Sequence, residues 1–208
     1  MQVAGSRFTV TTTFFLVRHA THALVDRVLV GRMGGVPLDA RGQQQARDLG
    51  QQLCQERLTG IQSSPRERAL ETARAIGVRT RLPIEISDEV DEIDVGGWTG
   101  LSFEELASLP DWHCWNTMRG TARPPDGESM AELQARVVRH LEKVHAKYPY
   151  GRIAIVTHAE VVRAAILHYL GLSLDQFFRI EVRPATVSIL VLGDRSSKVV
   201  KMNEAVSA

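Results

Sequence analysis

Two histidines and two arginines stand where a site for an anionic group could form. Arg18 and His19 come directly after an apolar run that is typical of a buried strand, and His158 follows a second such run. Arg68 lies one helical turn beyond a third strand-like segment. If these segments are neighbouring parallel strands, their carboxyl ends bring all four side chains to one crevice.

This set of side chains suits the chemistry of a phosphate monoester. The guanidinium of arginine presents a planar fork of donors that matches phosphate oxygens. A neutral imidazole can attack phosphorus, and neighbouring cations stabilise the oxygens as charge redistributes. The pattern therefore predicts phosphoryl transfer in which His19 and His158 are catalytic. Arg18 and Arg68 would bind the phosphate group.

A proton donor is also needed, because the leaving alkoxide of a monoester must be protonated. Glu92 begins a tryptophan-rich segment at about 88–128 that would wall the crevice. A partly desolvated carboxyl group has a raised pKa, which suits an acid at neutral pH. We therefore assign this role to Glu92, with Glu89, Asp91 and Asp94 as alternatives.

The composition narrows the partners of such a site. The chain has 208 residues with a formal net charge of +1, which gives no reason to expect nucleic acid or a membrane surface. Neither a GxxxxGK[ST] loop nor a carboxylate cluster for magnesium is evident, so we expect no metal and no cofactor. Cys54 and Cys114 stand apart from metal-ligand spacings and favour a reducing, cytoplasmic setting. The expected partner is a small-molecule phosphomonoester.

Strand-like and helix-like segments alternate along the chain. Apolar runs predict strands at 14–17, 60–63, 82–86 and 152–157, with a closing pair at 187–192 and 199–202. Amphipathic patterns predict helices at 42–56, 65–76, 129–147, 159–170 and near 174–178. Ser64 stands in a cap-like position for the second of these helices. The closing strand near 186–192 is a candidate for pairing across a homodimer.

This alternation predicts an α/β fold, a three-layer α/β/α sandwich with a mostly parallel sheet, as a single domain over 1–208. The segment at about 88–128 holds all three tryptophans and short helical patterns near 102–109 and 111–118. We expect it to form an inserted helical cap over the crevice. Its tryptophans would form the core of the cap rather than contact a substrate.

Five segments of the chain resemble, in order, the signature segments of the histidine phosphatase superfamily, the phosphoglycerate mutase-like fold. They are LVRHA at 16–20, SSPRERALETA at 63–73, DEIDVGGWTG at 91–100, PDGES at 125–129 and VTH at 156–158. The resemblance implies that His19 carries the phosphoryl group, while Arg18, Arg68 and His158 bind it. It also implies that Glu92 protonates the leaving group and later activates water.

The resemblance favours the phosphatase branch of the superfamily. Resemblance to the true mutases implies a longer insertion between the segments of Glu92 and His158, which helps to enclose a bisphosphorylated intermediate. A more open crevice admits water and favours hydrolysis. The alternatives are a cofactor-dependent phosphoglycerate mutase and a non-catalytic binding module on the same fold.

The chain departs from the family pattern just after His19. The usual glycine and acidic residue are replaced by Ala20 and Thr21. Thr21, or the backbone at Gly35, would then supply the missing phosphate contact. We interpret the other five histidines, His22 among them, as structural.

A second departure follows His158. The usual glycine pair, or glycine and aspartate, is replaced by Ala159 and Glu160. An acid so close to the crevice would favour a cationic or polyhydroxyl substrate, or would simply face solvent. We expect the solvated position, because a carboxylate is favourable in the first turn of a helix.

Overall fold

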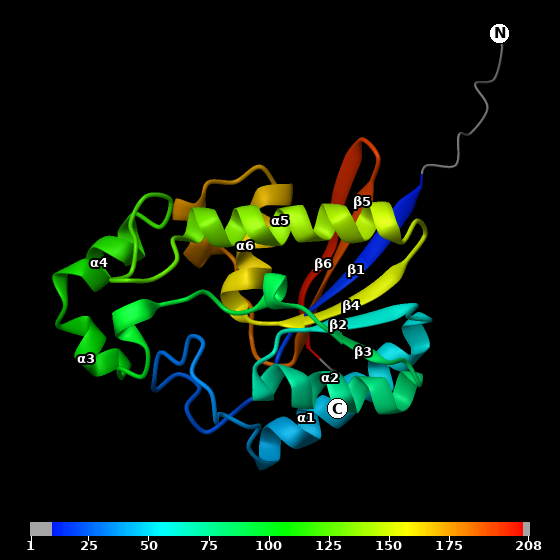
Figure 1. Ribbon diagram of the computed structural model, residues 1–208, viewed down its shortest axis with the longest axis horizontal. Helices are drawn as coiled ribbons and strands as arrows, with labels where there is room; N and C mark the ends of the chain where they lie inside the picture. The colour runs from blue at the N-terminus through cyan, green and yellow to red at the C-terminus, as the bar shows by residue number, and fades with distance from the viewer. Residues whose placement is uncertain (1–9, 206–208) are drawn as a thin grey trace, which may run out of the picture.

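Six strands form one sheet between two layers of helices in the computed structural model, which describes residues 10–205 (Figure 1). The strand order is β3-β2-β4-β1-β5-β6. The strands are β1 Thr11–Arg18, β2 Gly60–Ser63, β3 Ile84–Ile86, β4 Arg152–Thr157, β5 Thr186–Gly193 and β6 Ser196–Ala205. Strands β1 to β4 pair in parallel, whereas β5 and β6 run antiparallel. The predicted α/β/α sandwich with a mostly parallel sheet is confirmed.

The register of the parallel strands brings three segments of the chain to one edge of the sheet. Strands β1 and β4 end opposite each other, with Arg18 paired to Thr157. Strand β2 ends on the other side of β4, so that Ser64 follows it at the same edge. His19 and His158 continue β1 and β4 and therefore lie close together, with 5.1 Å between their ring centroids.

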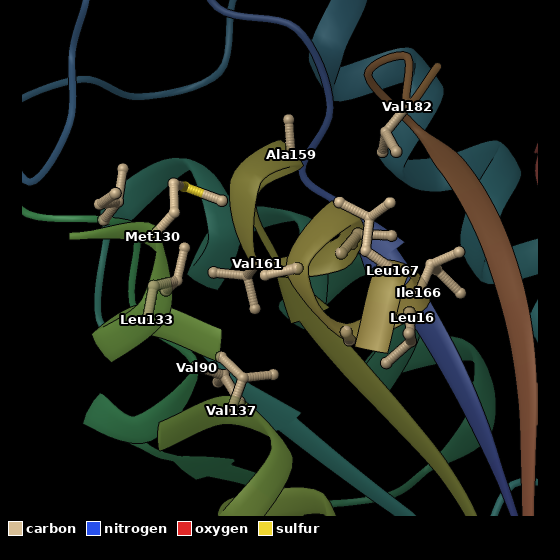
Figure 2. Packing of buried hydrophobic residues seen from close by; sticks show 14 of the residues in the cluster. Leu16, Val90, Met130, Leu133, Val137, Ala159, Val161, Ile166, Leu167 and Val182 are labelled. Atoms are coloured by element: carbon tan, nitrogen blue, oxygen red, sulfur yellow. The ribbon is translucent and has the colours of Figure 1, made fainter. Parts of the chain in front are cut away.

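Helices cover both faces of the sheet (Figure 1). Phe14 and Leu16 of β1 pack among helices α5 and α6, while Phe15 and Val17 pack among α1 and α2 on the other face. This alternation follows from the two-residue period of a strand. Figure 2 shows part of the first cluster, in which Leu16 lies beside Ile166 and Leu167 of α6. The helices are α1 Ala40–Leu53, α2 Glu67–Thr80, α5 Met130–Lys147 and α6 Ala159–Tyr169, with the 3₁₀ turns η1 Cys54–Glu56 and η4 Leu174–Arg179.

Helix α5 forms where the hydrophobic period predicts it. The Ser129 side chain accepts a hydrogen bond from the Glu132 backbone N–H, and the Glu132 carboxylate accepts one from the Ser129 N–H, which completes a capping box. The in-phase residues of this helix are buried, namely Leu133, Val137, Leu141 and Val144. Across residues 10–205, no helix has the length and apolar character that a membrane crossing requires.

Helix α2 begins later than the sequence pattern indicates. The expected capping by Ser64 is wrong, because the helix begins at Glu67 with Arg66 at the N-cap position and no side-chain cap. The Ser64 hydroxyl lies instead between Asp91 and His158, at 2.9 Å and 2.7 Å. Local sequence favours serine as a helix cap, but this hydroxyl forms hydrogen bonds with residues that are distant in the sequence.

Strand β5 is not free to pair with a second copy of the chain. It lies inside the sheet, with β1 on one side and β6 on the other. The expectation that this strand pairs across a dimer is therefore wrong. The two outer strands of the sheet are β3 and β6.

The tryptophan-rich segment forms short helices beside the sheet, at the left of Figure 1. The rings of Trp112 and Trp115 meet Trp98 edge to face, with centroid distances of 5.4 Å and 5.6 Å. Trp98 and Trp115 are buried, so the tryptophans do form a local core. The elements of this segment are η2 Asp88–Val90, η3 Gly96–Trp98, α3 Phe103–Ala107 and α4 Pro110–Thr117.

A tight contact at Gly96 ties this segment to the turn before α5. Gly96 has φ of +51°, and a Cβ on it would overlap the Pro125 carbonyl oxygen. The Gly97 N–H donates to that same oxygen at 2.8 Å, and the Glu128 N–H donates to the Asp94 oxygen at 2.7 Å. The loop that carries Glu92 is thereby held against the turn that carries Glu128.

We expect Gly96→Ala to destabilise the protein more than Gly171→Ala. Gly171 also has positive φ (+67°), but nothing lies within 4 Å of where its Cβ would be. Gly171→Ala therefore costs only the left-handed conformation, about 1 kcal/mol. Gly96→Ala adds a steric overlap with backbone and should cost about 2 kcal/mol more. Urea denaturation measures both free energies of unfolding, and equal losses would contradict the contact.

Candidate active site

A cavity of about 110 Å³ opens where β1 and β4 end. Four of the predicted residues line it, namely Arg18, His19, Arg68 and Glu92. His158 lies directly behind them, with its Nδ1 at 3.2 Å from Nη2 of Arg68 and 3.8 Å from Oε2 of Glu92. The structure therefore brings all five residues to one place.

His19 is oriented for attack through Nε2. Its Nδ1 lies 2.8 Å from the carbonyl oxygen of Ala20, which can only accept a hydrogen bond, so Nδ1 carries the proton. Burial lowers the pKa of His19 well below its ordinary value, and the charges of Arg68 and Arg18 lower it further. A neutral ring with a lone pair on Nε2 is the form that can attack phosphorus.

The two arginines keep donors for an anion. Arg18 donates from Nη1 to the Val182 oxygen at 2.7 Å, and Arg68 donates from Nη2 to the Gly31 oxygen at 2.7 Å. Nε of Arg18, and Nε and Nη1 of Arg68, are buried without a hydrogen-bond partner in the part of the chain that the structure describes. Burial lowers the pKa of both groups, but a guanidinium stays protonated in proteins. These donors can hold the oxygens of a phosphate group.

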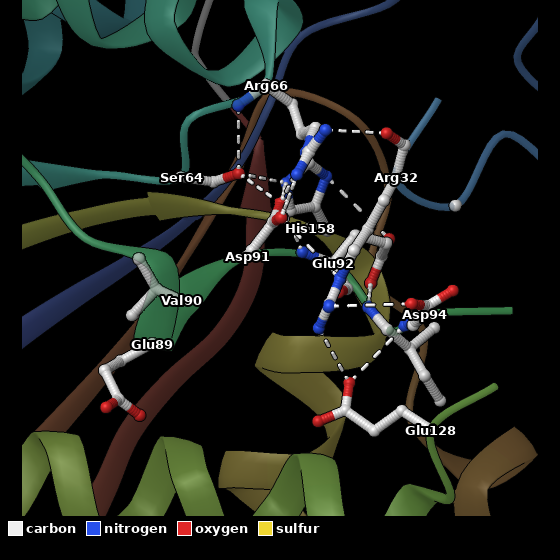
Figure 3. Close-up of polar contacts among 12 residues, drawn as sticks. Arg32, Ser64, Arg66, Glu89, Val90, Asp91, Glu92, Asp94, Glu128 and His158 are labelled. Atoms are coloured by element: carbon white, nitrogen blue, oxygen red, sulfur yellow. Dashed lines mark hydrogen bonds and ion pairs between the residues drawn. The ribbon is translucent and has the colours of Figure 1, made fainter. Parts of the chain in front are cut away.

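A chain of hydrogen bonds sets the tautomer of His158 (Figure 3). Nδ1 accepts from Arg68, because a guanidinium can only donate. Nε2 therefore carries the proton and donates to Ser64 Oγ at 2.7 Å, and that hydroxyl donates to Asp91 Oδ1 at 2.9 Å. Burial lowers the pKa of His158 well below its ordinary value, and Arg68 adds to this. The Nδ1 side of a neutral ring thus faces Glu92.

The roles of Ser64 and Asp91 were missed by the sequence analysis. Both residues lie in segments that match the family signature, which is the only signal that the sequence offers for them. Arg66 holds the Asp91 carboxylate through Nε at 3.0 Å and also through Nη2. Although burial opposes the effect, the hydrogen bonds from Arg66, the Glu92 N–H and Ser64 lower the pKa of Asp91. Asp91 is therefore a fixed negative charge behind His158.

Glu92 is the carboxyl group suited to donate a proton. Burial, and then the charge of Glu160, raise its pKa to about 8. Of the alternatives, Asp91 is paired with Arg66, Asp94 accepts from the Gly96 N–H, and Glu89 is exposed. Among these four carboxyl groups, only Glu92 lines the cavity.

Two arginines hold the backbone of Glu92, and Figure 3 shows one of them, Arg32. Its carbonyl oxygen accepts from Nε of Arg32 at 2.7 Å and from Nη2 of Arg136 at 3.1 Å. The Glu128 carboxylate pairs with both of these arginines, at 3.0 Å and 2.7 Å. Glu128 belongs to the PDGES segment, so this segment positions the loop that carries Glu92.

Thr21 and Gly35 do not join the site. The Thr21 hydroxyl donates to Asp39 at 3.1 Å, and Thr21 lines a different cavity, of about 520 Å³. The Gly35 N–H donates to Glu67 at 2.9 Å on the surface. Asp39 is also the N-cap of α1, so the start of that helix holds Thr21 away from the phosphate end of the cavity. The expected phosphate contacts by Thr21 and Gly35 are not supported.

Two residues that the sequence analysis set aside do line the cavity. The His22 ring lies 5.3 Å from that of His19, and burial, with the charges of Arg68 and Arg18, lowers its pKa to about 4. Glu160 also lines the cavity with a side chain that is 18% exposed, so its expected solvated position is wrong. Among residues 10–205, no group of three His, Cys, Asp or Glu side chains is placed to hold a metal ion.

Comparisons with known proteins show the family and support the fold. Phosphoserine phosphatase 1 of Hydrogenobacter thermophilus is 32% identical over 193 residues, which is 90% of either chain. The adenosylcobalamin/alpha-ribazole phosphatase of Escherichia coli is 28% identical over 171 residues, covering 81% of this chain and 84% of the relative. The solved structure of Bacillus stearothermophilus YhfR superposes with a TM-score of 0.87 at 25% identity, over 93% of this chain and 98% of that one. Residues 14–205 match the family described as histidine phosphatase superfamily (branch 1), and the chain belongs to this superfamily of phosphatases.

Proposed function

We propose that this protein hydrolyses small phosphomonoesters and that Nε2 of His19 carries the phosphoryl group between the two half-reactions. The observation that carries the proposal is the His19 ring, which is buried beside Arg18 and Arg68 with its Nδ1 bound to a carbonyl oxygen. The two relatives named as phosphatases of phosphoserine and of adenosylcobalamin/alpha-ribazole support a small phosphorylated metabolite as the substrate class.

The first half-reaction forms a phosphohistidine. Nε2 of His19 attacks phosphorus, the bond from phosphorus to the ester oxygen breaks, and Glu92 gives its proton to that oxygen. Arg18 and Arg68 hold the phosphoryl oxygens with donors that have no hydrogen-bond partner among residues 10–205. His158 stays neutral in this step, because its Nδ1 accepts from Arg68 and its Nε2–H donates to Ser64.

The second half-reaction returns the enzyme to its starting form. Water attacks the phosphohistidine, the ionised Glu92 takes a proton from that water, and the nitrogen–phosphorus bond breaks. Inorganic phosphate leaves, and Glu92 is protonated again.

We take 1–208 as one domain whose segment at about 88–128 caps the cavity, since Val95, Phe103 and Trp115 contribute to its wall. The bound phosphoryl group needs no metal ion in this scheme, because the two guanidiniums supply the positive charge.

We expect His19→Ala to abolish the reaction. Turnover of p-nitrophenyl phosphate should fall by at least ~10³-fold, and the acid-labile phosphoenzyme should disappear, because the nucleophile is gone. His168→Ala, at an exposed histidine of α6, is the control and should behave as the wild type. The assay is run with EDTA present. A labelled phosphoenzyme that persists in His19→Ala, or wild-type activity that EDTA removes, would contradict the scheme.

We expect Glu92→Gln to separate substrates by their leaving group. General acid catalysis contributes ~10²–10⁴-fold, so phosphoenzyme formation from an alkyl phosphate should slow by about that factor. Formation from p-nitrophenyl phosphate should lose much less, because p-nitrophenolate leaves without a proton. Rapid-quench measurement of the first turnover gives both rates, with Asp94→Asn as the matched control. Equal fractional losses on the two substrates would remove Glu92 from this role.

The pH dependence should report the protonation of Glu92. Its pKa is raised to about 8, and the protonated form is the donor, so kcat/KM for an alkyl phosphate should fall as pH rises through about 8. Glu160→Gln removes a neighbouring negative charge, which lowers the pKa of Glu92 and moves this fall to lower pH. Glu142→Gln, on the exposed side of α5, should leave the profile in place. A profile that is the same in wild type and Glu160→Gln would show that the charge of Glu160 does not act on the proton donor.

A further inference from the structure

The cavity wall carries groups of both charges. Arg18, Arg68, Glu92 and Glu160 all line it. Burial and the charge of Glu160 raise the pKa of Glu92 to about 8, which favours its protonated form at neutral pH. Glu160 is a second carboxyl group in the cavity, and beyond this effect on Glu92 the proposed reaction gives it no role.

The carboxylate of Glu160 lacks a hydrogen-bond donor for one of its oxygens in the described part of the chain. It lies in the first turn of α6, two residues after His158, with its side chain 18% exposed. Its Oε2 is buried and has no hydrogen-bond partner among residues 10–205. The nearest charged group is Nη1 of Arg163, at 3.6 Å from Oε2, which is too long for a hydrogen bond.

Neither of the arginines near Glu160 donates a hydrogen bond to it among residues 10–205. Arg163 donates from Nε to the Ile180 oxygen at 2.9 Å, and its guanidinium lies over the Phe177 ring at 4.6 Å. Arg119 stacks on Trp115 at 3.3 Å and donates from Nη2 to Asn116, and its Nε and Nη1 are buried without a partner in the described part of the chain. A partly buried carboxylate with an unpaired oxygen is costly unless a donor reaches it. Because Glu160 lines the cavity, a ligand bound there can supply a donor to the carboxylate.

We propose that Glu160 binds a primary ammonium group of the substrate. The preferred substrates are then small phosphomonoesters that carry an amine a few bonds from the ester oxygen. An ammonium offers three donors and a positive charge to a carboxylate, whereas a hydroxyl offers one donor and no charge. The cavity, at about 110 Å³, is far below the ~300–1,000 Å³ of pockets for drug-sized ligands, which favours a short chain between phosphate and amine. This inference rests on the proposed function, since it takes the phosphate to lie at Arg18 and Arg68.

Three phosphonates of equal length test the proposal by binding alone. They are 3-aminopropylphosphonate, 3-hydroxypropylphosphonate and n-butylphosphonate, which differ only in the terminal ammonium, hydroxyl or methyl group. A carbon–phosphorus bond replaces the ester bond, so none of them can be hydrolysed in this reaction. Calorimetry on the full chain gives a Kd for each, and the measured quantity is the ratio between compounds, because removing a negative charge also strengthens the binding of any phosphonate.

We expect the wild type to bind the ammonium compound roughly tenfold or more tightly than the methyl compound, as a charge-assisted hydrogen bond implies. Glu160→Gln should abolish this preference, and Glu160→Asp, which keeps the charge, should retain part of it. Glu142→Gln is the matched control and should keep the full ratio. A thermal melt of each variant shows that it is folded.

Several outcomes would overturn the proposal. A wild type that prefers the hydroxyl compound, shows no preference, or binds none of the three phosphonates has no ammonium site. A preference that survives in Glu160→Gln places the site elsewhere. These results are separate from the test at His19: a phosphohistidine without an ammonium preference retains the proposed hydrolysis, whereas an ammonium preference without a phosphohistidine retains only the binding site.

Discussion

Arg18, which is half-buried, and Arg68, which is buried, lie beside two imidazoles, and this partly desolvated positive charge is the constraint that shapes the site. Each guanidinium gives one donor to a backbone oxygen and keeps others for a ligand. Burial lowers the pKa of His19 and of His158, and the same charges lower both further, so the two rings stay neutral. One arrangement therefore accounts for both the neutral imidazoles and the cationic donors beside them.

Neighbouring carboxyl groups on one loop are driven to opposite protonation states. Asp91 is paired with Arg66 and linked through Ser64 to His158, which favours its ionised form. Glu92 is buried and faces Glu160, which favours its protonated form. When the surroundings of two carboxyl groups shift their pKa values in opposite directions, one group stays ionised and the other can carry a proton. Here the division occurs across a single peptide bond.

Two arginines and a glutamate fix the position of the loop that carries Asp91 and Glu92. Arg32 and Arg136 hold the backbone at Glu92, and Glu128 holds both arginines. The contact at Gly96 presses the same loop against the turn that carries Glu128. Side chains far apart in the sequence therefore restrain the position of one carboxyl group, which proton transfer at a defined atom requires.

Local sequence predicts most of the elements and most of the residues that meet at the candidate site. Buried strands and amphipathic helices follow from local periodicity, and residues at strand ends such as His19 and His158 follow from the parallel topology that this alternation implies. Local sequence does not predict the positions of side chains whose partners are distant in the sequence. Ser64 has the local signature of a cap, yet its hydroxyl is taken by His158 and Asp91. Glu160 has the signature of a solvated first-turn residue, and only the packing of α6 against the cavity turns it inward. The sequence pattern encodes what a residue can do, whereas three-dimensional packing decides which partner it meets.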